Sequence, residues 1–386
     1  MKVIYYSSLC FADCDFPLVR EMHKKGIKFK YYLLLPYGFQ KSNLLEFDSP
    51  LKKWGVYKAS HIKEMDNYRD CADLNQVFLI CGYTKWWSPL SWLLWLWAYL
   101  HMAMQCADIF HYTWQFKGLE KILYMLPVKG KKIMTVHDPI QHSGLAAEKK
   151  NEIERKRCFK WTDYFILLSS EKLDVFSNTY GIAKDRIKVS HLGAYDSIAY
   201  LNIPSITINK PYIIFFGTIT PHKGLEYLVQ AMHLVHDRFP EVELLIAGAG
   251  KIYFDDLLYN GYDYIKIENR YVGIRELVNL IKNALFTICP YKDATQSGVV
   301  QTSFTLNVPV VATSTGSLPK VVIDGVYGRI VPPCSVDSLS EVICELLEDP
   351  DMIRVMKNNI YEKWMSSMTW DSIVDDYVAL YKSNIL

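Results

Sequence analysis

One polar segment carries residue types that could bind a phosphorylated ligand. It begins at Asp293 and leads through Ser297, Gly298 and Val299 to Gln301, between two apolar runs. The pattern predicts a strand, a loop and then the start of a helix, where backbone N–H groups have no partner within the helix. Such free donors and the helix dipole both favour an anion. Amides for a diphosphate beside a carboxylate for sugar hydroxyls would suit a nucleotide-sugar.

A second polar loop follows the apolar run 212–216. It contains Gly217 and Thr218 and, five residues further on, Lys223. Glycine allows a ligand to approach the backbone closely, and lysine supplies a mobile positive charge for phosphate. A lone lysine in a turn is more often merely solvated. Its interpretation as a diphosphate contact therefore depends on the Asp293 loop lying nearby.

These two segments resemble the signatures of family-4-type retaining glycosyltransferases, which have the GT-B fold. The run 294–299 is similar to that of a polysaccharide-assembly subset. The family's E-x7-E pair falls on Asp293 and Gln301, so the second carboxylate is an amide here. The G-R-x-x-x-x-K-G loop of the family keeps Lys223, but Thr218 stands in place of the usual arginine. The resemblance thus implies a similar site with one cation and one carboxylate fewer.

The resemblance also implies roles for individual residues. The diphosphate would lie on the amides of 297–299 beside Lys223, Asp293 would hold the donor sugar, and Gln301 would hold the ribose. Asp293 and Lys223 would act in catalysis, because stabilising the charge that develops on the leaving phosphate is the expected main effect. Arg270 lies in the region that the family places near the donor base. With no second carboxylate placed as a nucleophile, a front-side path is the simplest hypothesis for retention.

Candidates for the acceptor side lie in the first half of the chain. His137 and Asp138 follow a predicted strand, and the family has a histidine in this region near the reacting sugar, so His137 is also a catalytic candidate. His111 follows another predicted strand. Ser8 and Asp13 lie in the first loop, which lacks the usual glycine pair of the family.

Short apolar strands alternate with helical patterns through both halves of the chain. This rhythm predicts an α/β fold with a doubly wound parallel sheet in each half, and 386 residues suffice for two cores. We expect an acceptor-binding domain over residues 1–197 and a nucleotide-sugar-binding domain over 210–386. Ligands bind beyond the carboxyl ends of such strands, so the Asp293 loop should face the cleft between the domains. The resemblance implies that the last helix, about 370–386, packs back on the first domain.

Residues 86–106 are unusually rich in tryptophan and leucine. The stretch is nearly long enough to span a bilayer, but crossing it would split one domain. Tryptophan prefers the interface between lipid and water, so we favour a helix lying in the membrane surface. Lys85 and Lys117 flank the stretch and could meet anionic head groups. The alternative is a helix buried in the first domain, and the two are compatible if the faces of the helix differ.

Composition narrows the class of protein further. A formal net charge of +2 lacks the basic field of a nucleic-acid-binding protein. Nine scattered cysteines indicate reduced thiols in the cytoplasm, and Cys10 and Cys14 have no second pair that would complete a metal site. No Asp-x-Asp motif stands in a suitable loop, so we expect neither a metal nor a cofactor beside the donor substrate. The N-terminal apolar run is too short for a signal peptide.

The leading hypothesis is a retaining hexosyltransferase of cell-surface polysaccharide synthesis. We expect it to act at the inner face of the membrane on a saccharide that is linked to a lipid. A nucleotide-sugar epimerase or hydrolase on the same scaffold is one alternative. A non-catalytic partner protein is another, since Thr218 and Gln301 would fit a degenerate site. Neither half has G-x-G-x-x-G after its first strand, which argues against a dinucleotide oxidoreductase.

Overall fold

The computed structural model describes residues 1–83, 85, 87–139, 148–201, 203–206, 210–294 and 297–383, and for 148–151 it describes the backbone alone. The chain divides into two compact units. The first comprises residues 1–201 and 370–386, and the second comprises residues 202–369. The helix α12 (Trp370–Ser383) thus belongs to the first unit although it ends the chain.

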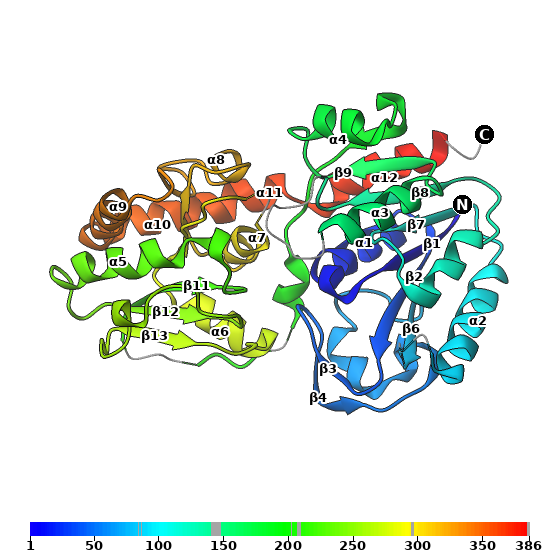
Figure 1. The fold of residues 1–386 in the computed structure, drawn as a ribbon, viewed down its shortest axis with the longest axis horizontal. Coiled ribbons are helices and arrows are strands. Elements are labelled where there is room, and N and C mark those ends of the chain that lie inside the picture. Colours follow the sequence, from blue (N-terminus) through cyan, green and yellow to red (C-terminus); the bar gives the residue numbers. More distant parts are fainter. Residues whose placement is uncertain are drawn as a thin grey trace. The chain divides into compact units, whose positions relative to one another are not determined.

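The first unit is built on an eight-stranded sheet (Figure 1). Its order is β10-β9-β8-β7-β1-β2-β6-β5, and every neighbouring pair is parallel except β5 and β6. The strands are β1 (Lys2–Ser7), β2 (Lys28–Pro36), β5 (Gly55–Lys58), β6 (Val77–Gly82), β7 (Ile109–Tyr112), β8 (Lys132–Val136), β9 (Tyr164–Leu167) and β10 (Ile187–Val189). A separate antiparallel pair is formed by β3 (Phe39–Lys41) and β4 (Glu46–Leu51).

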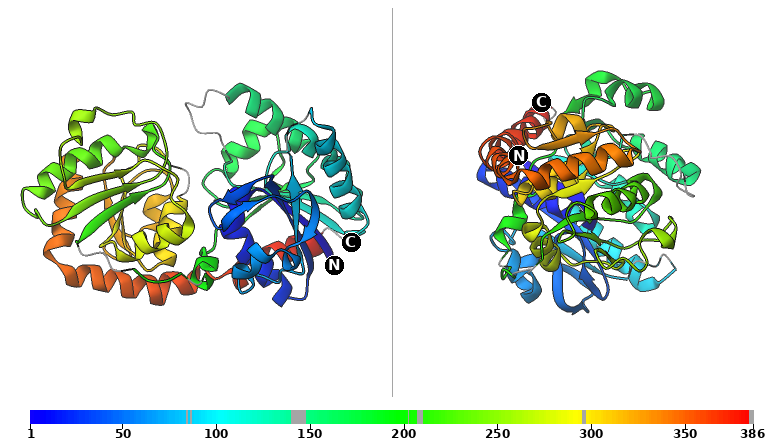
Figure 2. Two further views of the ribbon diagram at one scale, coloured as in Figure 1. Left: turned by 90° about the horizontal axis from the view of Figure 1, so that it is seen from below. Right: turned by 90° about the vertical axis from the view of Figure 1, so that its left-hand side faces the viewer.

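Helices cover both faces of this sheet (Figure 2). One face shares a core with the helical segments α2 (Pro89–Ala103), η4 (Gly118–Met125), α3 (Glu148–Phe159) and α4 (Leu173–Tyr180). The other face carries α1 (Ala12–Lys24), and α12 packs against α1. Because both faces are covered, the central strands are almost continuously apolar, as parallel sheets require.

Polar and aromatic contacts hold α12 on the first unit. The Trp370 indole N–H donates to the carbonyl oxygen of Ala194 at 2.6 Å. A Cβ added to Gly193 would lie 2.6 Å from the Trp370 ring, so only glycine fits there. On the next turns Lys25 forms an ion pair with Asp375 at 2.7 Å. The helix is therefore bound at several points along its length.

The second unit has a six-stranded parallel sheet in the order β13-β12-β11-β14-β15-β16. Figure 1 labels its strands β11, β12 and β13. The strands are β11 (Tyr212–Phe216), β12 (Glu243–Ala247), β13 (Ile265–Glu268), β14 (Thr287–Cys289), β15 (Val310–Thr313) and β16 (Gly328–Val331). The helices are α5 (Leu225–His236), α6 (Ile274–Asn283), α7 (Gly298–Thr305), α8 (Leu318–Val321), α9 (Val336–Glu348), α10 (Pro350–Asn359) and α11 (Met365–Ser367).

The strand order reverses direction once in each sheet. In the first unit the chain leaves β1 toward β2 on one side and returns as β7 on the other. In the second unit the corresponding neighbours are β11 and β14. The loops at the carboxyl ends of such neighbours diverge and leave a crevice, which is where open α/β sheets bind ligands. The topology therefore directs attention to the loops after β1, β7, β11 and β14.

The helix expected over 86–106 is shorter in the structure. It forms α2 from Pro89 to Ala103, and Trp86 lies outside the described residues. Proline at its first position suits a helix start, because the missing N–H has no partner there anyway. Within the described residues, no helix combines the length and apolarity that a membrane crossing needs.

Candidate functional site

The loops that follow β11 and β14 lie side by side. The Lys292 backbone N–H donates to the carbonyl oxygen of His222 at 2.8 Å. Gly224 has φ +66°, and a Cβ at this residue would lie 2.1 Å from the carbonyl oxygen of Pro290. Glycine is therefore required here both by backbone conformation and by contact. The two polar loops singled out in the sequence thus form one surface at the point where the strand order reverses.

Lys223 places its ammonium group on an aromatic ring of the neighbouring loop. Its Nζ lies 3.7 Å from the centroid of the Tyr291 ring. Burial lowers the pKa of Lys223 because it disfavours the charged form. Across the described residues no carboxylate forms an ion pair with Lys223. The π face of Tyr291 offsets only part of that charge, so an anion would stabilise it further.

The amino end of α7 offers backbone donors beside this lysine. Ser297 precedes the helix, and its Oγ accepts the N–H of Val300 at 3.4 Å. The Tyr291 hydroxyl lies 3.3 Å from the same Oγ. Gly298 is exposed and Val299 is half-buried. As the first two residues of a helix they direct N–H groups beyond its end.

Gly217 brings the backbone of the first loop close to α7. It has φ +119°, and a Cβ on it would lie 3.5 Å from Cγ2 of Val299. Its N–H donates to the carbonyl oxygen of Ala247 at 3.0 Å, and a Cβ at Gly248 would lie 1.8 Å from the Gly217 oxygen. Thr218 is exposed beside it. Three loops are thus packed at backbone distance next to the α7 amino end.

The two positions of the expected acidic pair differ in environment. Asp293 is exposed on the loop before α7, whereas Gln301 is only 8% exposed. The Oε1 atom of Gln301 is buried without a hydrogen-bond partner within the described part of the chain. Leaving a buried acceptor unsatisfied costs about 1–3 kcal/mol, so this oxygen is suited to accept from a ligand hydroxyl. Thr295 and Gln296, between them, lie outside the described residues.

An ion pair that sequence reasoning missed joins α5 to the Asp293 loop. Lys292 Nζ lies 2.6 Å from Glu226 Oε1, and the Tyr253 hydroxyl donates to Glu226 Oε2 at 2.7 Å. Burial alone would raise the pKa of Glu226, but hydrogen bonds from Lys292 and Tyr253 lower it overall. The three residues come from separate segments, so their spacing carries no signal of the pair. It fixes the residue next to Asp293 and the helix that follows Lys223.

We expect Glu226→Gln to weaken nucleotide binding by roughly tenfold, because one lost ion pair of this kind costs on the order of 1–2 kcal/mol. The loop carrying Asp293 would then lose a fixed point. Calorimetric titration with UDP, GDP and ADP measures the effect. The double exchange Glu226→Lys with Lys292→Glu should recover part of the loss, and Glu241→Gln, at an exposed site, should bind normally. Unchanged affinity in Glu226→Gln would contradict a positioning role.

Arg270 has different partners from those expected. Its Nε lies 3.0 Å from Glu268 Oε2, and its Nη1 donates to Glu276 Oε2 at 2.9 Å. Hydrogen bonds to Glu276 and Glu268 raise its pKa further above the usual value. With its charge already compensated, Arg270 would have to leave these carboxylates before it could contact a phosphate.

In the first unit His137 lies against an aromatic pair, Phe11 and Trp114, at the carboxyl end of the sheet. The His137 ring stacks on Phe11 with centroids 3.7 Å apart, and Trp114 lies 6.1 Å from Phe11. Burial lowers the pKa of His137 to about 3, so the ring is neutral at physiological pH. Its Nε2 atom is buried, and no described residue bonds to it. A ligand could satisfy this buried nitrogen with a hydrogen bond.

His111 does not serve the acceptor role expected from the sequence. It is completely buried, with Nδ1 2.5 Å from the Tyr381 hydroxyl and Nε2 2.8 Å from Thr135 Oγ1. Burial, together with the nearby His137, lowers the pKa of His111 to about 3. Both ring nitrogens are used inside the unit, so His111 links the sheet to α12 rather than contacting a substrate.

The other acceptor candidates lie on or near the first loop. Ser8 is half-buried and accepts a weak hydrogen bond from Cys10 Sγ at 3.4 Å. Asp13 is half-buried, accepts the N–H of Cys14 at 3.0 Å, and burial raises its pKa to about 7. Asp138 is exposed at the end of the described part of its own loop.

A second carboxyl below this loop, Asp15, carries a shifted pKa. It is 1% exposed and accepts hydrogen bonds from the hydroxyls of Tyr5 at 2.5 Å and Tyr31 at 3.1 Å. Burial raises its pKa to about 7, although the hydrogen bonds act in the opposite direction. In the sequence it reads only as an acidic residue in the first turn of a helix.

Asp15 should make the folded first unit less stable as pH rises. The carboxyl ionises near pH 3.9 in the unfolded chain but near 7 in the folded one. Between these values the unfolded state has already lost its proton, so ionisation favours unfolding. We therefore expect the stability of Asp15→Asn, relative to the unchanged protein, to increase between about pH 4 and pH 7 and to stay constant above that. Urea unfolding of both proteins tests this, and parallel pH profiles would contradict it.

Part of the chain matches a known protein family, and relatives that carry glycosyltransferase names match it at low identity. The family described as "Glycosyl transferases group 1" matches residues 210–349, which include every candidate for donor binding. An uncharacterized glycosyltransferase of Methanocaldococcus jannaschii is 26% identical over 235 residues, or 56% of this chain and 59% of that protein. The alpha-maltose-1-phosphate synthase of Mycolicibacterium smegmatis is 24% identical over 313 residues, or 72% and 79%.

A solved structure extends the likeness to both units. Anabaena HepE in complex with UDP and glucose superposes with a TM-score of 0.65 at 14% identity, over 99% of each chain. The chain has the GT-B fold. The expected pair of doubly wound parallel sheets is thereby confirmed. The chain spans about three fifths of the length of the M. jannaschii relative. The match to the family model is limited to residues 210–349.

Proposed function

We propose that the protein is a retaining glycosyltransferase that transfers a hexose from a nucleoside-diphosphate sugar to a saccharide acceptor. The observation that carries this proposal is the position of Lys223. Its ammonium lies beside the amino end of α7 without a carboxylate partner in the described chain, inside the region that matches the glycosyltransferase family. A cation and free backbone amides together suit a diphosphate.

In this proposal the two loops stabilise the leaving nucleotide. The N–H groups of Gly298 and Val299 and the ammonium of Lys223 would bind the diphosphate as its negative charge develops. Asp293 would accept hydrogen bonds from the donor sugar. The unsatisfied Oε1 of Gln301 would accept one from the ribose. The amides and Lys223 would thus assist the bond-breaking step, whereas Asp293 and Gln301 would hold the donor.

Retention is proposed to follow a front-side path. Asp293 is the sole carboxylate in the sequence of the two loops, residues 217–224 and 290–301. It is assigned to the donor sugar, which leaves no residue of these loops as a nucleophile. The departing phosphate would then take the proton of the acceptor hydroxyl. His137, neutral because of its lowered pKa, would orient a substrate through a hydrogen bond rather than by charge.

The acceptor is proposed to be a lipid-linked saccharide of cell-surface polysaccharide synthesis, used at the inner face of the membrane. Support comes from α2, whose two sides differ. Ser91, Leu94, Trp95, Ala98 and Met102 are buried against the sheet. The opposite side, here called the α2 face, exposes Leu90, Trp92, Leu93, Leu96, Trp97, Leu100 and Met104. Such a contiguous apolar surface is typical of an interaction site, and its tryptophans suit a membrane interface.

Nucleotide release tests the proposal directly. The protein is incubated with UDP-, GDP- and ADP-sugars, with and without a bacterial extract of lipid-linked saccharides. We expect release from one donor that increases with the extract. Release that ignores the extract would indicate a hydrolase, and conversion of the sugar without release would indicate an epimerase. Nucleotide binding without any turnover would indicate a non-catalytic partner protein instead.

A further inference from the structure

Lysines gather at one end of the first sheet, on the same face that α2 covers elsewhere. Lys2 on β1 stands opposite Lys28 on β2, and Ile4 stands opposite Lys30. Lys58 on β5 stands opposite Phe78 on β6. Ile4 and Phe78 belong to the core beneath α2. The lysines therefore continue an apolar sheet face beyond the point where its covering helix ends.

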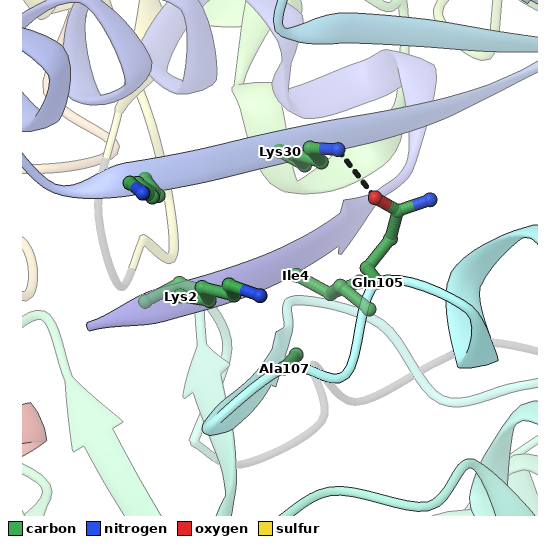
Figure 3. A pocket seen from close by; sticks show the side chains of 7 residues that line it. Lys2, Ile4, Lys30, Gln105 and Ala107 are labelled. Atoms are coloured by element: carbon green, nitrogen blue, oxygen red, sulfur yellow. Dashed lines mark hydrogen bonds between the residues drawn. The ribbon is translucent and has the colours of Figure 1, made fainter.

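The chain just after α2 closes a small cavity over these lysines. Gln105 and Ala107 line it together with Val3 and Ile4, and its volume is about 120 Å³. Lys2, Lys28 and Lys30 complete the lining. Figure 3 shows the Lys2 and Lys30 side chains extending in the same direction, toward Gln105, whose Oε1 accepts a hydrogen bond from Lys30. The cavity thus joins apolar walls to several ammonium groups.

The ammonium groups of this cluster form no ion pair with an acidic side chain in the part of the chain that the structure describes. Among the described residues none pairs a carboxylate with Lys2, Lys28, Lys30 or Lys58 through the side-chain ammonium. Asp108 is nearby, and one of its oxygens accepts the backbone N–H of Lys2 at 2.7 Å. Burial lowers the pKa of Lys30, and the charges of Lys58 and Lys2 lower it further. An anion bound here would relieve that mutual repulsion.

The cavity adjoins the exposed apolar side of α2. Met104, which follows the helix directly, is 71% exposed and is next to Gln105 in the chain. The α2 face continues from there through Leu100 and Leu96. A helix lying in a membrane surface buries such residues at the acyl boundary, where nearby lysines reach the level of the phosphates.

We propose that Lys2, Lys28 and Lys30 form a binding site for the phosphate of an anionic lipid head group, and that this site and the α2 face together dock the first unit on an anionic bilayer. This inference deepens the membrane part of the proposed function. We assign a lipid phosphate rather than a free one because the apolar surface begins directly beside the cavity. Within the first unit, the site lies at the amino ends of the strands, away from the carboxyl-end loop that carries His137.

Vesicle sedimentation of the full chain tests the docking site. Vesicles of phosphatidylcholine alone are compared with vesicles that contain phosphatidylglycerol as about one lipid in three. We expect the unchanged protein to bind the anionic vesicles. Lys28→Gln with Lys30→Gln should weaken binding by roughly 25-fold, since each lysine near an anionic surface contributes about fivefold. A matched control, Lys266→Gln with Lys282→Gln, removes the same charge from exposed sites of the second unit.

The controls distinguish a specific lysine site from general electrostatic attraction between the protein and the anionic vesicles. Equal losses in the two double variants would overturn the proposal, because general charge would then suffice. Leu96→Ser with Leu100→Ser should also lose binding, since docking needs the α2 face. Inorganic phosphate, added as a competitor, tests whether the lysines bind free phosphate instead of a lipid phosphate. If it binds the lipid-free protein and displaces the vesicles, the cluster is a free-phosphate site and the lipid assignment is wrong.

Failure of this inference and failure of the proposed function give different results. The Lys28→Gln and Lys30→Gln variant should release nucleotide normally with a soluble saccharide acceptor, because the lysines are not part of the donor site. Unchanged melting temperature would show that it is folded. Absence of turnover with intact vesicle binding would refute the transferase and leave the docking site. Turnover without any lysine-dependent vesicle binding would support the transferase and refute the docking site.

Discussion

Lys223→Ala should lower kcat/KM for the donor by about 100-fold or more, because removing one preorganised group from a developing oxyanion commonly costs on the order of 3–4 kcal/mol. The ammonium lies 3.7 Å from the centre of the Tyr291 ring, beside the amino end of α7. Burial already lowers its pKa, so a bound diphosphate would favour its charged form. Steady-state kinetics with the donor identified by nucleotide release measure the loss.

Two further variants define the cause of that loss. Lys223→Arg keeps the positive charge and should retain more activity than alanine, although the planar guanidinium does not match the position of an ammonium. Lys251→Ala removes an exposed lysine of the same unit and should leave turnover unchanged. Asp293→Ala should lose about tenfold or more through weaker contacts to the donor sugar. Near-normal turnover in both Lys223→Ala and Asp293→Ala would refute the site.

Trp370→Ala should destabilise the first unit by about 3–5 kcal/mol, the usual cost of deleting a large buried aromatic side chain. Trp370 is 4% exposed, packs on Gly193 and donates to the Ala194 carbonyl. Its loss would leave a cavity and an unsatisfied carbonyl at the start of α12. The helix that returns to the first unit would then lose its first point of attachment.

Urea unfolding measures this effect, with the two units treated as separate transitions where they are resolved. Tyr361→Ala is the control, since Tyr361 is 72% exposed and a surface change of this kind stays within about 0.5 kcal/mol. Trp370→Phe should cost less than alanine because it keeps most of the packing and loses the hydrogen bond. A loss below about 1 kcal/mol in Trp370→Ala would show that α12 is held mainly by its other contacts.

The sequence alone determined the class of fold and the loops that carry the donor candidates. Strands such as β11 and β14 are short apolar runs, and the polar segments that follow them begin at Gly217 and Pro290. Local patterns of this kind depend on neighbouring residues, so they can be predicted from a short window of the sequence. The amino end of α7 was predictable for the same reason, because Ser297 and the residues after it are consecutive.

Only the tertiary structure decided which distant residues meet. The order of the strands brings Lys292 to Glu226, and it buries His111 against Tyr381 of the last helix. It also divides α2 into a buried side and an exposed one, a choice that its nearly uniform apolar sequence leaves open. Hydrophobic periodicity specifies local structure but not long-range pairing. The partners of these residues, and with them the roles, therefore became visible only in the folded chain.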